Sequence, residues 1–95
     1  MKFKLYQIKD IENCRYAFLG FNSAKQMGFT LDDYEVVYED EVASMPDEDA
    51  LESLFYIFNC RSPKDFKGRS MSPSDVVELN GKVYYTDRIG FKEIK

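Results

Sequence analysis

Residues 76–86 read Val76-Val77-Glu78-Leu79-Asn80-Gly81-Lys82-Val83-Tyr84-Tyr85-Thr86. Two runs rich in β-branched and aromatic residues, which favour strands, flank the pair Asn80-Gly81. Both residues of this pair adopt a positive φ readily, and a two-residue turn of that geometry matches the twist of antiparallel strands. The segment therefore predicts a β-hairpin with strands at residues 76–79 and 82–86.

Three further segments are predicted to be strands, because apolar and polar residues alternate along them. They cover residues 2–8, 34–39 and 91–94. In the second of these, Tyr34, Val36 and Tyr38 are expected to share one face of the strand. Glu35 and Glu39 are expected to line the other face. The segment from residue 10 to residue 19 fits neither a strand period nor a helix period.

A short helix is predicted over residues 22–27, since Asn22 and Ser23 suit a helix start and Gly28 suits a helix end. Phe21 and Met27 are expected to pack inward from it. A second, clearer helix begins near Pro46 and ends near Asn59. Acidic residues fill its first turn, where they favour the positive end of the helix dipole. Its apolar stripe recurs at helical spacing and comprises Leu51, Leu54, Phe55 and Phe58.

These elements interleave without a regular strand–helix–strand rhythm, which predicts the α+β class. We expect a small, mostly antiparallel sheet of about four to five strands, packed by about two to three helices on one face. The chain has 95 residues, the size of one domain, and contains no linker or repeat. Residues 1–95 are therefore expected to form a single domain.

The composition excludes several classes of enzyme. The chain has no His, which rules out imidazole bases, His-containing triads and His-bearing metal sites. Cys14 and Cys60 lie far apart in the sequence and match neither a zinc spacing nor a redox pair. No catalytic, metal-binding or cofactor-binding residue is predicted. No apolar run has the length of a signal sequence or a membrane span, so a cytoplasmic location without membrane contact is expected.

The most unusual segment is residues 68–75, Gly68-Arg69-Ser70-Met71-Ser72-Pro73-Ser74-Asp75. Its hydroxyls and its guanidinium could hold an anionic group. Alternatively, Ser72, Ser74 and Asp75 bond to neighbouring backbone groups and shape the entry to the hairpin. Tyr84, Tyr85 and Phe91, further along the chain, could form an aromatic patch for a partner. Alternatively, Tyr85 lies with Val83 on the inner face of the sheet and Tyr84 is a half-exposed cross-strand residue.

Charge is unevenly distributed along the chain. The net charge is −4, and residues 32–60 contain ten acidic residues and no basic one. Carboxylates of this block could imitate a row of DNA phosphates, and the candidate residues for such an acidic face are Glu35, Glu39, Glu48 and Glu52. A basic run around Phe66 could instead follow a nucleic-acid strand, and it comprises Arg61, Lys64, Lys67 and Arg69. The overall negative charge disfavours nucleic-acid binding.

Several of these motifs together resemble the YodL-like domain family of Firmicutes over roughly residues 34–94. The resemblance rests on Tyr34-Glu35-Val36-Val37-Tyr38, on the apolar stripe of the second helix, on residues 63–77 and on Asn80-Gly81 with the Gly90-Phe91 ending. It implies a small accessory domain, often carried on mobile elements, with no established enzymatic activity or cofactor. Any functional surface would then lie at the family signature, which comprises Arg69, Ser70, Ser72, Ser74, Asp75 and the edge from Tyr84 to Phe91.

We therefore expect a non-enzymatic, cytoplasmic module that binds a protein partner through the serine-rich segment and the adjacent sheet edge. The first alternative is an acidic DNA mimic that inhibits a DNA-binding protein of the restriction type. The second alternative is a weak nucleic-acid-binding accessory protein that uses residues 61–69.

Overall fold

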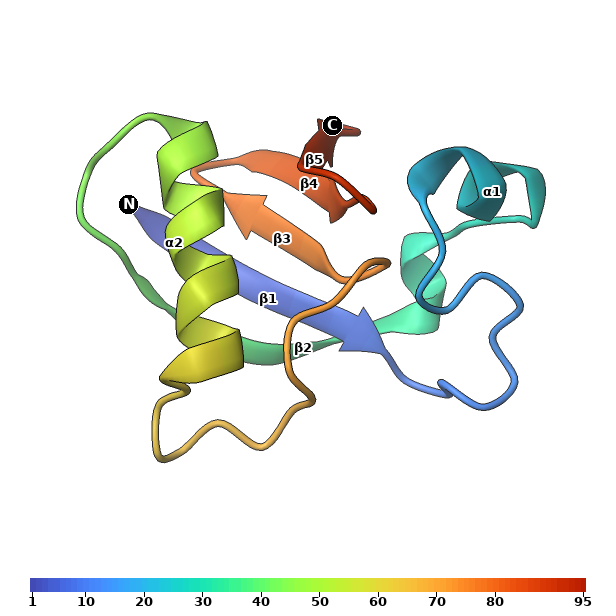
Figure 1. Cartoon of the computed structure of the whole chain (residues 1–95), viewed down its shortest axis with the longest axis horizontal. Helices are drawn as coiled ribbons and strands as arrows, with labels where there is room; N and C mark the ends of the chain where they lie inside the picture. The colour runs from blue at the N-terminus through green and yellow to red at the C-terminus, as the bar shows by residue number, and fades with distance from the viewer.

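The computed structural model describes residues 1–95 and contains a five-stranded sheet with two α-helices (Figure 1). The elements follow in the order β1 (Lys2–Ile8), α1 (Phe21–Gln26), the 3-10 turn η1 (Leu31–Asp33), β2 (Tyr34–Glu41), α2 (Asp47–Cys60), β3 (Val76–Leu79), β4 (Lys82–Thr86) and β5 (Phe91–Glu93). The predicted α+β class is confirmed, and every predicted strand and helix is present. Neither helix is both long enough and apolar enough to cross a membrane.

The strands lie in the order β2-β1-β3-β4-β5, and each neighbouring pair is antiparallel. The first strand of the chain is therefore internal, between β2 and β3, while β2 and β5 form the two edges. The predicted hairpin joins β3 to β4, with Asn80 at φ 51° and Gly81 at φ 87°. Both turn residues adopt the left-handed conformation that this turn requires.

Apolar side chains cover both faces of the sheet. Val76 and Val77 are adjacent in β3 but belong to different clusters, and successive side chains of a strand point to opposite faces. Beneath α2 the buried cluster is Phe3, Leu5, Ala50, Leu51, Leu54, Phe58, Met71, Val77, Leu79 and Tyr84. On the opposite face the buried cluster is Ile8, Tyr16, Ala24, Tyr34, Val76 and Tyr85.

The two helices consequently lie on opposite faces, whereas the sequence suggested one covered face. The pairs Val76-Val77 and Tyr84-Tyr85 place apolar side chains on both faces of the sheet. Each face is therefore stable only when another segment packs on it and shields it from water. The segment that contains α1 supplies the second cover. Phe21 packs inward against Tyr85, with ring centroids 5.1 Å apart. Met27 was expected to do the same but is 39% exposed.

A β-bulge in β2 changes the expected face pattern of that strand. Leu5 of β1 pairs with Tyr38, whereas the next residue, Tyr6, pairs with Val36, so Val37 is the extra residue. Tyr38 therefore lies on the α2 face, while Tyr34 packs into the opposite cluster. The bulge likewise separates two acidic residues: Glu35 pairs with Gln7 on the α2 face, and Glu39 pairs with Lys4 on the other. The expectation that Glu35 and Glu39 line one face is wrong.

Candidate functional site

The serine-rich segment, residues 68–75, folds inward against β1, and Gln7 holds it there. The Gln7 amide donates from Nε2 to the carbonyl oxygen of Arg69 at 2.8 Å and accepts at Oε1 from the Arg69 N–H at 2.9 Å. Nε2 also donates to Asp75 Oδ2 at 3.0 Å, and this oxygen accepts from the Ser72 N–H at 3.0 Å. One buried side chain thus fixes both ends of the segment. Sequence analysis missed Gln7, although it follows Phe3 and Leu5 on the apolar face of its strand.

Ser74 is held in an unusual backbone conformation at the end of this segment. Its φ is 81°, in the left-handed region that non-glycine residues seldom adopt. The Tyr34 hydroxyl donates to the Ser74 carbonyl oxygen at 2.5 Å, and Ser74 Oγ accepts from the Phe18 N–H at 3.0 Å. Ser74 is only 1% exposed, so its hydroxyl has a structural role.

Asp75 carries a carboxyl group inside the protein, where it is 2% exposed. Burial raises the pKa of this carboxyl to about 7, although the hydrogen bonds from Gln7 and Ser72 and the positive charge of Arg69 act to lower it. Desolvation favours the neutral form, because a buried charge loses its interaction with water. The carboxyl is therefore partly protonated near neutral pH while it joins β1 to the serine-rich segment.

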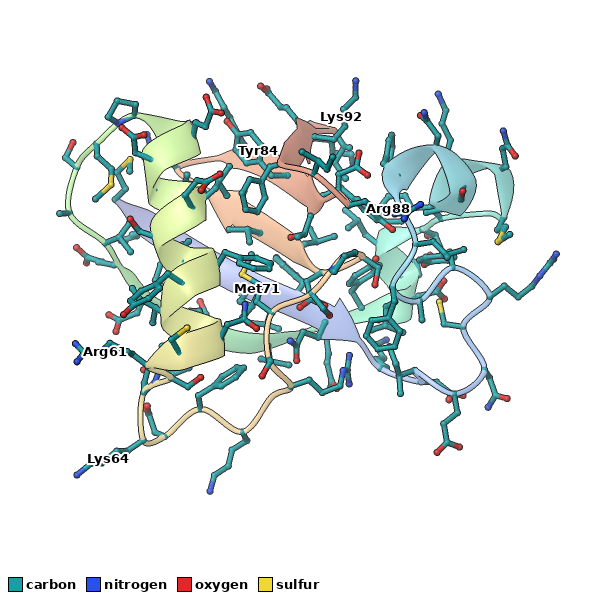
Figure 2. All side chains as sticks on the ribbon, viewed as in Figure 1. Arg61, Lys64, Met71, Tyr84, Arg88 and Lys92 are labelled. Carbon is teal, nitrogen blue, oxygen red and sulfur yellow. The ribbon has the colours of Figure 1, made fainter.

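The residues expected to bind a partner divide into two groups. Ser74, Asp75 and Tyr84 are buried, in contrast to the expectation that they form an exposed partner surface. Tyr84 extends from the sheet (Figure 2) and packs in the cluster beneath α2. Its hydroxyl donates to Asp47 Oδ2 at 2.6 Å. Burial, together with this hydrogen bond, raises the pKa of Tyr84 to about 12. The remaining candidates are exposed or half-buried, namely Arg69, Ser70, Ser72 and Phe91.

Arg69 also makes hydrogen bonds within the chain, through both its side chain and its backbone. Its Nη2 donates to the carbonyl oxygen of Ile8 at 3.2 Å, and its backbone is held by Gln7. Arg69 Nη2 and the Ser74 hydroxyl therefore bond within the chain, while the buried Arg69 Nε has no hydrogen-bond partner in the protein.

The basic run around Phe66 lacks the exposed aromatic residue that a nucleic-acid surface would need. The Phe66 ring packs into the core, with its centroid 4.8 Å from that of Phe58. Figure 2 shows Arg61 and Lys64 directed away from the sheet beside the end of α2. Phe66 therefore does not provide these charges with an exposed ring on which a base could stack.

The acidic residues of the proposed DNA mimic do not form one row. Glu48 and Glu52 are exposed on α2. Glu39 lies on the opposite face of the sheet, beside Lys4, and Glu35 lies at the β2 edge.

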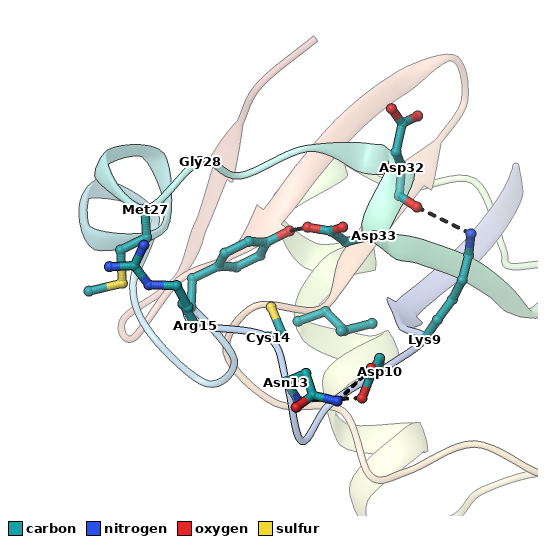
Figure 3. Close-up of a pocket in the computed structure, with 11 residues that line it drawn as sticks. Lys9, Asp10, Asn13, Cys14, Arg15, Met27, Gly28, Asp32 and Asp33 are labelled. Carbon is teal, nitrogen blue, oxygen red and sulfur yellow. Dashed lines mark hydrogen bonds between the residues drawn. The ribbon is translucent and has the colours of Figure 1, made fainter.

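A loop cavity of about 380 Å³ lies between the end of β1 and the segment that contains α1 (Figure 3). Several of its polar groups are already paired. Lys9 Nζ donates to the Asp32 carbonyl oxygen at 3.2 Å, and the Tyr16 hydroxyl donates to Asp33 Oδ2 at 2.6 Å. Asn13 Nδ2 donates to Asp10 Oδ2 at 2.8 Å. No group of three or more Cys, Asp or Glu side chains in the protein is placed to hold a metal ion.

A second hollow, which sequence analysis missed, lies between α2 and the edge strand β5. It consists of two cavities that share Phe91, of about 220 and 290 Å³. We call it the α2–β5 groove, and its principal lining residues are Glu48, Glu52, Phe55, Thr86, Arg88, Phe91 and Glu93. The helix stripe predicted Phe55 as a core residue, but it is 37% exposed and meets Phe91 edge-on at 6.5 Å. Next to Arg88, Ile89 is 94% exposed.

Comparisons with known proteins identify a family but no characterised relative. No curated protein matches the chain, and no solved structure does. The YodL-like domain model matches residues 2–95, which extends the resemblance at residues 34–94 to the central strand β1 and its Gln7. The chain therefore belongs to the YodL-like domain family.

Proposed function

We propose that this protein is an interaction module without catalytic activity, which binds a partner protein at the α2–β5 groove and the neighbouring Ile89. The observation that carries the proposal is Ile89, which is 94% exposed at the β4–β5 turn. A single exposed apolar residue is common on protein surfaces, but this one adjoins a groove lined by Phe55 and Phe91. Apolar groups gathered in this way lose contact with water when a partner covers them.

The edge of the sheet supports the same surface. β5 pairs only with β4, so the backbone groups on its other side are open to a further strand. Of the partner site expected at the sheet edge, we therefore retain Phe91 and its surroundings in the proposal. Ser74 and Asp75 have no part in it, because they are buried, whereas Tyr84 lines the second cavity of the groove.

The proposal includes the location of the protein in the cell. We place the module in the cytoplasm, since Cys14 and Cys60 are both free thiols and reduced cysteines are typical of that compartment. The family resemblance favours a role as an accessory protein of a Firmicutes mobile element or chromosome.

A capture experiment with two matched variants tests this function. Tagged wild-type protein is incubated with a Firmicutes lysate, with and without nuclease treatment, and bound proteins are identified by mass spectrometry. Ile89→Asp is compared with Val36→Asp, which alters another exposed β-branched residue, 41% exposed, on the opposite edge strand. We expect partners to bind the wild type and Val36→Asp but to be lost with Ile89→Asp. Equal capture by both variants, or loss of all capture on nuclease treatment, would contradict the proposal.

A further inference from the structure

Thr86 brings an unsatisfied polar atom to the α2–β5 groove. The residue is 2% exposed, and its Oγ1 has no hydrogen-bond partner in the protein. A buried hydroxyl without a partner is unfavourable, and most such groups in proteins are satisfied. Thr86 lines the smaller cavity together with Glu52, Phe55 and Phe91. A polar group that enters this cavity and reaches Thr86 Oγ1 would supply the missing bond.

The charged residues that line the groove indicate whether the incoming polar group is positively or negatively charged. The two cavities are lined by five carboxylates and one guanidinium, the residues being Asp47, Glu48, Glu52, Asp87, Glu93 and Arg88. Two of the carboxylates are engaged within the chain: Asp47 accepts from Tyr84, and Asp87 accepts from the Phe21 N–H at 3.2 Å. Glu48, Glu52 and Glu93 are exposed and make no ion pair. An incoming cation would be attracted to these three residues.

The walls of the groove suit a long basic side chain. Phe55 and Phe91 offer apolar surface for the methylene groups of Lys or Arg and ring faces for the positive head. Such a head could donate to Thr86 Oγ1 and to Glu52. Phosphate or carboxylate groups of a partner would instead be repelled by the net negative charge of the groove.

The spacing of the two cavities matches an extended peptide. Phe91 pairs with Thr86 at the first cavity, and Glu93 pairs with Tyr84 at the second. These positions are two residues apart on the same face of β5, the repeat of a β-strand. A peptide that adds to the free edge of β5 would therefore direct alternate side chains into successive cavities.

We infer that the groove binds an extended segment of a partner protein with Lys or Arg at alternate positions, which adds to β5 as a sixth strand and donates to Thr86. This inference rests on the proposed function and names the chemistry of its partner. The charge of the groove and the unpaired Thr86 hydroxyl are observations additional to the exposed Ile89.

The inference is tested by NMR titration of the full chain with two capped peptides, Thr-Lys-Thr-Lys-Thr and Thr-Glu-Thr-Glu-Thr. We expect the basic peptide to shift the amide signals of Thr86, Phe91 and Glu93, with an affinity that falls severalfold as salt rises from about 0.05 to about 0.5 M. The acidic peptide should leave these signals in place. Equal binding of both peptides, no shift at β5, or shifts confined to β2 would overturn the inference.

Two variants separate this binding from an effect on the fold. Thr86→Val removes the unpartnered hydroxyl at nearly constant volume, so the unfolding temperature should stay the same or rise. The affinity of this variant for the basic peptide should fall severalfold. Glu52→Gln should also weaken binding, whereas the control Glu39→Gln, on the opposite face, should not. Full-strength binding by Thr86→Val and Glu52→Gln would contradict the assigned site.

The two proposals fail in different ways. If Ile89→Asp abolishes partner capture but the basic peptide does not bind, the surface is correct and the basic occupant is wrong. If Ile89→Asp leaves capture unchanged, the proposed function itself fails.

Discussion

Asp75 provides a test of the buried network that anchors the serine-rich segment. Burial raises its pKa from the ordinary value of 3.8 to about 7 in the folded protein. Between these values the folded protein binds one more proton than the unfolded chain, so the contribution of Asp75 to stability falls as the pH rises. That contribution is fully present below about pH 4 and is lost as the pH passes through about 7.

The expected size of the effect follows from the two pKa values. Each tenfold difference in proton affinity corresponds to 1.36 kcal/mol, so the rise from 3.8 to about 7 corresponds to at most about 4 kcal/mol. Asp75→Asn removes the titration while its side-chain oxygen can still accept from Gln7 and Ser72. Relative to this variant, the wild type should therefore lose about 3 kcal/mol of unfolding free energy between pH 4.5 and 8.5, because about 1 kcal/mol of the total is already lost below pH 4.5.

Urea unfolding of both proteins across this pH range measures the difference directly. Subtracting the unfolding free energy of Asp75→Asn from that of the wild type at each pH cancels the contribution of the surface carboxylates that the two proteins share. Asp32→Asn, at an exposed site, is the matched control and should show no comparable change with pH. A difference between wild type and Asp75→Asn that stays constant with pH would refute the reasoning. A difference that grows in favour of the wild type at high pH would show that the bonds from Gln7 and Ser72 outweigh burial.

The same network predicts two further losses of stability. Gln7→Leu leaves both backbone groups of Arg69 without their partner and removes one of the two hydrogen bonds to the Asp75 carboxyl, so urea unfolding should show a loss of about 2–4 kcal/mol. The matched control Gln26→Leu, at an exposed position in α1, should change stability little. Gly68→Ala places a Cβ 2.6 Å from Gln7 Oε1 and 2.7 Å from the Phe66 ring, which should lower the unfolding free energy by about 1–3 kcal/mol. An unfolding temperature for Gly68→Ala equal to that of the wild type would contradict this close approach.

The strands and helices could be predicted from the sequence because their signals are local. Asn80-Gly81 determines a turn through the φ values that these two residues allow, and the apolar stripe of α2 determines which side of that helix is buried. The order of the strands in the sheet depends instead on contacts between residues far apart in the chain, such as Phe3 with Leu79. No local pattern specifies such pairs.

The candidate site was harder to predict, since it depends on which residues the fold brings together. The serine-rich segment looked like a binding loop because Ser and Arg suit anions, and its role became clear only through Gln7, more than 60 positions earlier in the chain. The bulge at Val37 moved Tyr38 to the α2 face, because one extra residue reverses the alternation of a strand.

The sequence by itself determined the α+β class, the hairpin and the absence of imidazole chemistry, since these depend on composition and on neighbours along the chain. Only the tertiary structure decided that Asp75 and Tyr84 are interior and that Phe55, Thr86 and Phe91 share a groove. Burial and proximity arise when distant segments pack together, and the free energy of that packing belongs to the whole fold.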